Sequence, residues 1–117
     1  MTKQLPHNHS HHTEKLLESW ETAPDFGQVA DVFKQLSDPT RVRIFWLLCH
    51  CEECVINISA LMEMSSPAVS HHLRQLKESG LIVSRREGKE VYYKAAATEE
   101  SNLLHRTIEK IVKITCP

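Results

Sequence analysis

With 117 residues, 41% of them hydrophobic, and a net charge of −1, the chain has the size of one domain with a modest core. It contains no apolar run long enough to cross a membrane, and no apolar stretch follows the polar N-terminus as in a signal peptide. We therefore expect a cytoplasmic protein, in which four cysteines favour metal or redox chemistry over structural disulfides.

The first thirteen residues form a polar, His-rich segment. Such a composition buries too little apolar surface to fold by itself, so we expect a disordered tail over residues 1–13 and a single domain over residues 14–117. The tail carries four candidate metal ligands, His7, His9, His11 and His12. The alternative interpretation is a solvated tail without a role, or residual cloning sequence.

Three helical segments are predicted in the first half of the chain. A short one covers Glu14 to about Trp20, and the next runs from Phe26 to Leu36. The apolar face of the second segment consists of Val29, Val32, Phe33 and Leu36. Asp38 as N-cap and Pro39 in the first helical position begin the third, from Thr40 to about Cys49. Its predicted core residues are Val42, Ile44, Phe45, Leu47 and Leu48.

A loop, a short strand and a short helix are predicted next. Residues 51–54 form the loop, and the β-branched pair Val55-Ile56 favours a strand that joins the hairpin predicted further on. Asn57 suits the N-cap of a helix from Ile58 to Met64, on which Leu61 is expected to point inward.

Residues 65–80 have the pattern of a helix with an apolar stripe and a polar face. Ser65 and Ser66 are capping residues, Pro67 suits the first position, and Gly80 ends the helix. The predicted stripe consists of Val69, Leu73 and Leu76, with His72 beside it as a packing or hydrogen-bonding residue. Short polar groups near the start of such a helix can approach base edges, while Arg and Lys reach guanine or phosphate. The predicted DNA contacts on this helix are Ser66, Ala68, Ser70, His71, Arg74 and Lys77.

A two-stranded ribbon is predicted directly after this helix. Residues 81–83 begin a strand, Glu87-Gly88-Lys89 forms a tight turn, and residues 91–93 return. The predicted DNA contacts at its tip are Arg85, Arg86 and Lys89. Six lysines and arginines stand against three glutamates between Ser70 and Lys94, so this region is basic within a nearly neutral chain. A capped helix followed by a basic ribbon predicts a winged helix-turn-helix that binds double-stranded DNA; for the basic tip alone, the alternative is a solvated hairpin.

A final helix is predicted from a cap at Thr98 to about Thr115. Its apolar residues are Leu103, Leu104, Ile108, Ile111, Val112 and Ile114. They offer more apolar surface than one small domain needs on one side, which suggests a homodimer formed through the last and the first helices. The predicted fold class is therefore mainly α with a small β-hairpin wing. We find no Gly-rich phosphate loop and no nucleophile–base pair, so we do not expect an enzyme.

Two segments in combination give the chain a resemblance to a known family. Residues 36–41, LSDPTR, open the third helix, and residues 66–73, SPAVSHHL, form the recognition helix. Together with the ribbon, they resemble the ArsR/SmtB family of bacterial metal-sensing repressors over about residues 26–115. The resemblance implies a winged-helix homodimer that represses an operon without its effector and leaves the operator when the effector binds.

The metal sites common in this family are incomplete here. A Cys-x-Cys-Asp segment matches residues 54–57, where only Cys54 is kept and Ile56 and Asn57 replace the second Cys and the Asp. A site on the last helix matches Ala97, Glu99, Lys110 and Lys113. We expect no metal there, because two lysines repel a cation. His105 and Glu109, four residues apart on this helix, are interpreted as a surface pair.

A different set of thiols is the candidate effector site. Cys49, Cys51 and Cys54 form a Cys-x-Cys-x-x-Cys cluster, which suits Zn(II), Cd(II), Cu(I) or As(III). We expect Cys51 and Cys54 to bind the effector, with Cys49, the tail histidines and Cys116 as further candidates. The alternatives are a core role for Cys49 and exposed loop thiols without a role.

Two other functions remain open at this point. The same fold could respond to thiol oxidation or persulfide, since closely spaced cysteines form reversible bridges. The chain could instead be a small cytosolic metal-binding protein without a DNA role, although this leaves Arg74, Arg85 and Arg86 unexplained. The metal-responsive repressor accounts for the most features.

Overall fold

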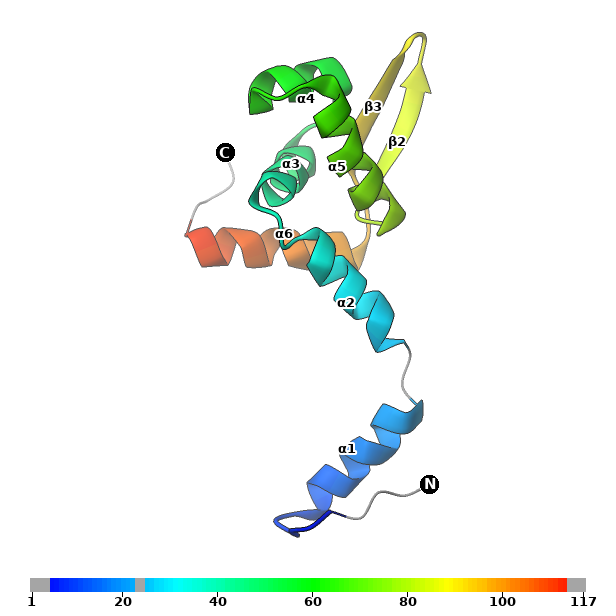
Figure 1. Cartoon of the computed structure of the whole chain (residues 1–117), viewed down its shortest axis with the longest axis vertical. Coiled ribbons are helices and arrows are strands. Elements are labelled where there is room, and N and C mark those ends of the chain that lie inside the picture. The colour runs from blue at the N-terminus through cyan, green and yellow to red at the C-terminus, as the bar shows by residue number, and fades with distance from the viewer. Residues whose placement is uncertain (1–4, 23–24, 114–117) are drawn as a thin grey trace. The chain divides into compact units, whose positions relative to one another are not determined.

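The computed structural model describes residues 5–22 and 25–113. They belong to two compact units, of which the first ends at Ala30 and the second begins at Asp31. Figure 1 shows the elements in chain order. None of the helices within the described residues is long and apolar enough to cross a membrane. The predicted division into a tail and one domain at residue 13 stays a prediction.

The first unit contains helix α1, His11–Thr22, and the beginning of helix α2, Phe26–Gln35. The first helix was expected from Glu14 but begins three residues earlier, so His11 and His12 belong to its first turn. Within this unit, the rings of Trp20 and Phe26 meet edge to face with centroids 6.3 Å apart.

Helix α3, Pro39–His50, begins as predicted, with the Asp38 carboxylate accepting a hydrogen bond from the Arg41 backbone N–H (3.3 Å) and proline in the first turn. The Arg41 guanidinium then reaches back to Gln35, donating to its side-chain oxygen at 2.6 Å. Gln35 is buried, and this bond gives the oxygen of its side-chain amide a hydrogen-bond donor. The Asp38–Arg41 segment therefore fixes both the start of α3 and the end of α2.

The core of the second unit lies where α3 and the next two helices, α4 (Val55–Met62) and α5 (Ser66–Glu78), meet the base of the ribbon. Its members, all at most 2% exposed, are Ile44, Phe45, Leu48, Ile58, Val69, Leu73, Leu76, Leu81 and Ile82. The stripe predicted on the recognition helix is confirmed. Val42 and Leu47 were predicted in the core but are only half-buried, as are Val32 and Leu36 of the preceding segment.

The strand predicted at Val55-Ile56 lies two residues earlier, at β1, Glu53–Cys54. It pairs antiparallel with β3, Glu90–Ala95. Val55 instead begins helix α4, Val55–Met62, with Cys54 as N-cap. Asn57 does not cap this helix but donates from its side chain to the Glu53 carboxylate at 2.8 Å. The inward position predicted for Leu61 was wrong, because α4 packs through Ile58 and Ser59, and Leu61 lies outside that face, 62% exposed.

Helix α5, Ser66–Glu78, is bounded on both sides by the residues that the sequence indicated. The Ser65 hydroxyl accepts from the Ala68 backbone N–H at 3.3 Å, and proline stands in the first turn. At the other end Gly80 has φ +77°, and the Leu81 N–H returns to the Leu76 carbonyl at 3.1 Å. Glycine takes this left-handed conformation without the steric cost of a Cβ, so it ends the helix sharply.

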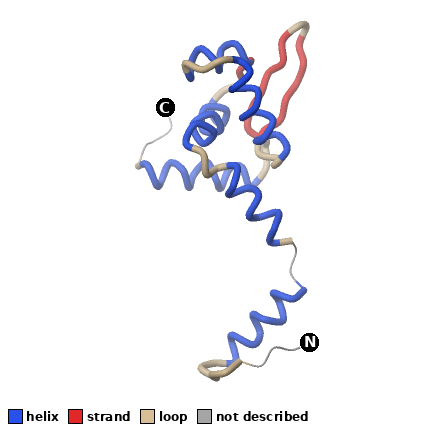
Figure 2. Tube along the Cα trace, viewed as in Figure 1, coloured by secondary structure: helices blue, strands red, loops and turns tan. Residues whose placement is uncertain are grey.

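The ribbon consists of β2, Ile82–Glu87, and β3, Glu90–Ala95, in a sheet of order β1-β3-β2 (Figure 2). Gly88, at φ +63°, and Lys89 form its two-residue turn, which requires a left-handed residue. Helix α6, Glu99–Val112, follows a cap in which the Thr98 hydroxyl accepts from Ser101 N–H. Ser101 is itself buried, and its hydroxyl donates to the Leu81 carbonyl. The predicted end of this helix at Thr115 lies outside the described residues.

Candidate functional site

The side of α5 opposite the core carries most of the residues predicted to contact DNA. Ser66, His71, Arg74 and Lys77 are exposed, while Ala68 and Ser70 are half-buried. Because Val69, Leu73 and Leu76 are fully buried on the opposite side, the helix cannot rotate without opening the core. The polar face is therefore held in a fixed orientation.

Two of these polar groups also bond inside the protein. The Ser66 and Ser59 hydroxyls lie 3.2 Å apart, which ties the start of α5 to α4. The Lys77 ammonium donates to the Ser84 hydroxyl at 2.8 Å, which ties the end of α5 to β2.

The two arginines of the ribbon lie on opposite faces. Ser84 and Arg86 share a face by the two-residue repeat of a strand, and Lys77 of α5 reaches that face. Arg85 pairs across the ribbon with Tyr92 and lies over its ring, 4.9 Å from the centroid. Its guanidinium also contacts the Glu52 carboxylate at 2.6 Å and the Glu87 carboxylate at 2.7 Å.

These contacts change the acidity of the groups involved. The hydrogen bonds that Arg85 donates to Glu52 and then to Glu87 raise the pKa of Arg85, and the bond to Glu52 lowers the pKa of that carboxyl. Arg85 is consequently already paired with two carboxylates. Arg86 and Lys89 are exposed and share no such pair in the described part of the chain.

His72 connects the recognition helix to the start of α3. Its Nδ1 accepts from Arg41 Nε at 3.3 Å and lies 3.4 Å from the Asp38 carboxylate. Burial lowers the pKa of this imidazole, Asp38 raises it, and Arg41 and His71 lower it further, with a net decrease. The interpretation of His72 as a hydrogen-bonding residue agrees with this geometry. Sequence reasoning missed the role of Arg41, since no spacing in the sequence relates it to His72, 31 positions away.

The three described cysteines differ in their surroundings. Cys54 is buried, Cys49 is half-buried, and Cys51 is exposed, with its thiol 3.5 Å from the Leu47 carbonyl. Burial and then the negative charge of Glu53 raise the pKa of Cys51, which disfavours its thiolate. Within residues 5–22 and 25–113, no cysteine belongs to a group of three ligand atoms that lie close enough together to bind one metal ion. Cys116 lies outside the described residues.

The tail histidines belong to the first unit. The rings of His7 and His9 stack with centroids 5.7 Å apart, and His11 lies 4.0 Å from the Glu14 carboxylate. His12 is exposed in the same turn of α1.

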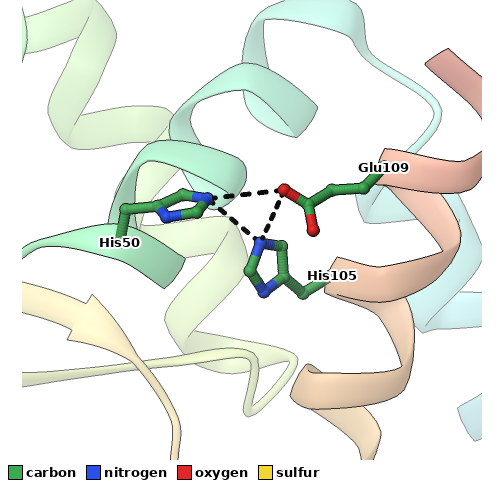
Figure 3. A group of neighbouring side chains, drawn as sticks. All are labelled: His50, His105 and Glu109. Carbon is green, nitrogen blue, oxygen red and sulfur yellow. Dashed lines mark hydrogen bonds and ion pairs between the residues drawn. The ribbon is translucent and has the colours of Figure 1, made fainter. Parts of the chain in front are cut away.

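A second polar cluster lies between the end of α3 and the middle of α6 (Figure 3). His50, His105 and Glu109 point toward one another, with side chains 21%, 17% and 14% exposed. His105 and Glu109 do pair, 3.4 Å apart, as the sequence suggested, but His50 and Trp46 of α3 also contact Glu109, and both members of the pair are half-buried. Sequence reasoning missed His50, since no sequence spacing relates it to α6.

The core and recognition face just described coincide with a known family pattern. The family model described as "Bacterial regulatory protein, arsR family" matches residues 38–84, from the Asp38 cap through α5 into β2. The "Transcriptional repressor SmtB homolog" of Synechocystis is 38% identical over 84 residues, which make up 72% of this chain.

The chain belongs to the ArsR family of bacterial regulatory proteins. This ArsR-family chain is also 50% identical over 66 residues, 56% of its length, to a Staphylococcus aureus protein named "Cadmium resistance transcriptional regulatory protein CadC homolog". The matches span 64% of the Synechocystis relative and 54% of the S. aureus relative, less than two thirds of either.

A solved structure supports the ArsR-family fold. The homodimeric winged helix-turn-helix DNA-binding domain of a possible ArsR-family regulator from Mycobacterium bovis is 28% identical, with a TM-score of 0.67 over 94% of this chain and 91% of that domain. The predicted winged helix-turn-helix is thereby confirmed. Members of the ArsR family are transcriptional regulators and not enzymes, as the sequence indicated.

Proposed function

We propose that this ArsR-family chain is a transcriptional repressor that binds operator DNA as a homodimer and leaves it when a thiophilic metal ion binds through Cys51 and Cys54. The observation that carries the DNA-binding part is the fixed polar face of α5. Three fully buried side chains orient this helix, while His71 and Arg74 on its other side are exposed.

The proposed interface assigns different tasks to helix and ribbon. Ser70, His71 and Arg74 would face base edges in the major groove, because the N-terminal half of a recognition helix enters deepest. Lys77, Arg86 and Lys89 would neutralise phosphates on the same side. Arg85 would instead brace the ribbon, because two carboxylates already satisfy its charge.

Apolar side chains on α6 support the homodimer. Leu103, Ile111 and Val112 are 48%, 74% and 53% exposed. Val112 also lines a mostly apolar groove, together with Leu36, Pro39, Val42, Trp46, Ile108 and the polar Ser37 and Arg43. Exposed apolar surface of this kind marks a protein interface. A two-fold dimer would present two copies of α5 about 34 Å apart, one helical turn of DNA.

The assignment of the effector rests on the cysteines and on the relatives. Cys51 and Cys54 flank the start of β1, whose partner strand β3 belongs to the ribbon. A ligand held there would act directly on the proposed interface. The name of one relative, a cadmium resistance regulatory protein homolog, favours a metal. Two thiolates do not complete a tetrahedral site, so further ligands are required, for which the tail histidines, Cys49 and Cys116 stay predictions.

The experiment is a titration of labelled promoter DNA, taken from upstream of the chain's own gene, followed by fluorescence anisotropy. We expect binding at least about 10³-fold tighter than to random duplex. Equal affinity for both duplexes would contradict the repressor.

The same titration identifies the effector class. Zn(II) or Cd(II) should release the wild-type protein, while Cys54→Ser should bind the operator normally and not be released. Release by peroxide or persulfide and not by metal would replace the metal effector with thiol chemistry. Because binding is reciprocal, operator DNA should weaken the metal affinity by the same factor.

A further inference from the structure

The histidine–glutamate cluster between α3 and α6 has the geometry of a metal site. His50 Nε2 and His105 Nε2 are 3.1 Å apart, His105 Nε2 and Glu109 Oε2 are 3.4 Å apart, and His50 Nε2 and Glu109 Oε2 are 3.7 Å apart. Zn(II) bonds to nitrogen and oxygen at about 2.0–2.2 Å, so neighbouring ligands of a tetrahedral ion lie about 3.3–3.6 Å apart. The three ligand atoms therefore already have nearly the required separations.

The chemistry of these atoms also calls for a cation. Each is an electron-pair donor when the imidazoles are neutral, and all three face a common point (Figure 3). Two imidazole nitrogens at hydrogen-bond distance share only one proton between them, and both also approach the same carboxylate oxygen. A divalent ion at the common point satisfies all three at once.

Trp46 supplies an outer partner of the kind that metal ligands use. Its indole N–H donates to Glu109 Oε2 at 3.3 Å, and its ring lies 4.5 Å from that of His50. Such groups orient the ligands and are part of a built site. The three ligand side chains are 14–21% exposed, which leaves access for an ion and for a water molecule as a fourth ligand.

We propose that His50, His105 and Glu109 bind one zinc-class divalent ion that joins the end of α3 to α6. The donor set of two histidines and one carboxylate fits Zn(II) with one open position. This ion is independent of the cysteine effector, because it uses no thiol. Its consequence is to fasten α6, which carries the exposed apolar residues, to the body of the second unit.

The test uses Trp46 as a local reporter. Trp20→Phe leaves Trp46 as the single tryptophan of the full chain. Co(II) should quench its fluorescence, and Zn(II) should displace Co(II) and restore it, because Zn(II) binds such sites more tightly. In this background, we compare the midpoint, which is the Co(II) concentration at half-maximal quenching. His105→Gln and Glu109→Gln should each raise it by more than about tenfold, since even outer partners change metal affinity 10–100-fold.

Two control variants separate this site from the others. Glu100→Gln removes an exposed carboxylate from the same helix and should leave the midpoint unchanged. Cys51→Ser/Cys54→Ser should also leave it unchanged. Quenching that is lost in the cysteine variant and kept in His105→Gln would overturn the proposal while supporting the cysteine effector.

A second measurement guards against variants that do not fold. Zn(II) should raise the thermal midpoint of the Cys51→Ser/Cys54→Ser protein, and adding His50→Gln, at the last residue of α3, should abolish that rise. Absence of quenching in the Trp20→Phe parent, or an unchanged midpoint in His105→Gln and Glu109→Gln, overturns the site.

Discussion

Helix α5 and the junction of α3 with α6 use the same types of polar residue in opposite ways. On α5, His71 and Arg74 are exposed on a helix that a fully buried stripe holds in place. At the junction, the side chains of His50, His105 and Glu109 face one another and are 14–21% exposed, although the His50 residue as a whole is exposed. The difference shows that neighbouring elements, and not residue type, decide whether a polar group binds an outside partner or completes an internal site.

The largest expected effect comes from loosening the support of α5. Leu73→Ala should lower the free energy of unfolding by about 2–5 kcal/mol, because Leu73 is fully buried and the change leaves a cavity. Urea denaturation measures this loss. Leu103→Ala, on the exposed side of α6, is the matched control.

Leu103→Ala should have little effect on the stability of the subunit but should weaken the dimer in sedimentation experiments, since Leu103 is 48% exposed. If Leu73→Ala and Leu103→Ala lowered the free energy of unfolding equally, the buried side of α5 would support the fold no more than the exposed side of α6.

The next effect concerns the exposed face of α5. Arg74→Ala should weaken specific operator binding by about 1–3 kcal/mol if the guanidinium contacts a base. Anisotropy titrations on operator and random duplex measure both affinities. An equal loss on the two duplexes would make Arg74 a phosphate contact.

The recognition helix could be predicted because its signals are local. Ser65 and Gly80 mark its ends, and the spacing of Val69, Leu73 and Leu76 gives its buried side, all within one segment. The junction could not be predicted in this way, since His50 and His105 are 55 positions apart in sequence. Only the packing of α3 against α6 brings them together.

Two errors in the fold have a similar cause. Val55 and Ile56 have high strand propensity, yet the pairing of the two preceding residues with β3 places the strand earlier. Helix α4 then begins at Val55, directly after this strand, and not at Ile58. A partner strand about 40 residues away thus decides where α4 begins.

A smaller effect separates the two faces of the ribbon. Arg86→Ala should reduce the slope of log affinity against log salt by about one, because it removes one phosphate contact. Arg85→Ala should change this slope less, because two carboxylates already pair with its guanidinium. Operator titrations at several salt concentrations compare the two. A larger change in slope for Arg85→Ala would reverse the assignment of the faces.

The smallest effect is a pH dependence at the link between α5 and α3. The pKa of His72 is lowered in the folded protein, chiefly by burial. The unfolded chain therefore takes up a proton more readily, so stability should fall as the pH drops below the ordinary value of about 6.5. The contribution of His72 to stability is completely lost once the pH lies below the pKa of His72 in the folded protein. Above about 6.5 the neutral ring accepts from Arg41 and the contribution is fully present.

His72→Gln keeps a hydrogen-bond acceptor near Arg41 but does not titrate. Between pH 7.5 and pH 5.5, the urea midpoint of unfolding should decrease less for this variant than for the wild type. The effects of the other histidines are the same in both proteins and cancel in the difference. Were the two decreases equal, protonation of His72 would not be coupled to folding. In that case Asp38, 3.4 Å from the imidazole, would be offsetting the cost of burying the charged ring.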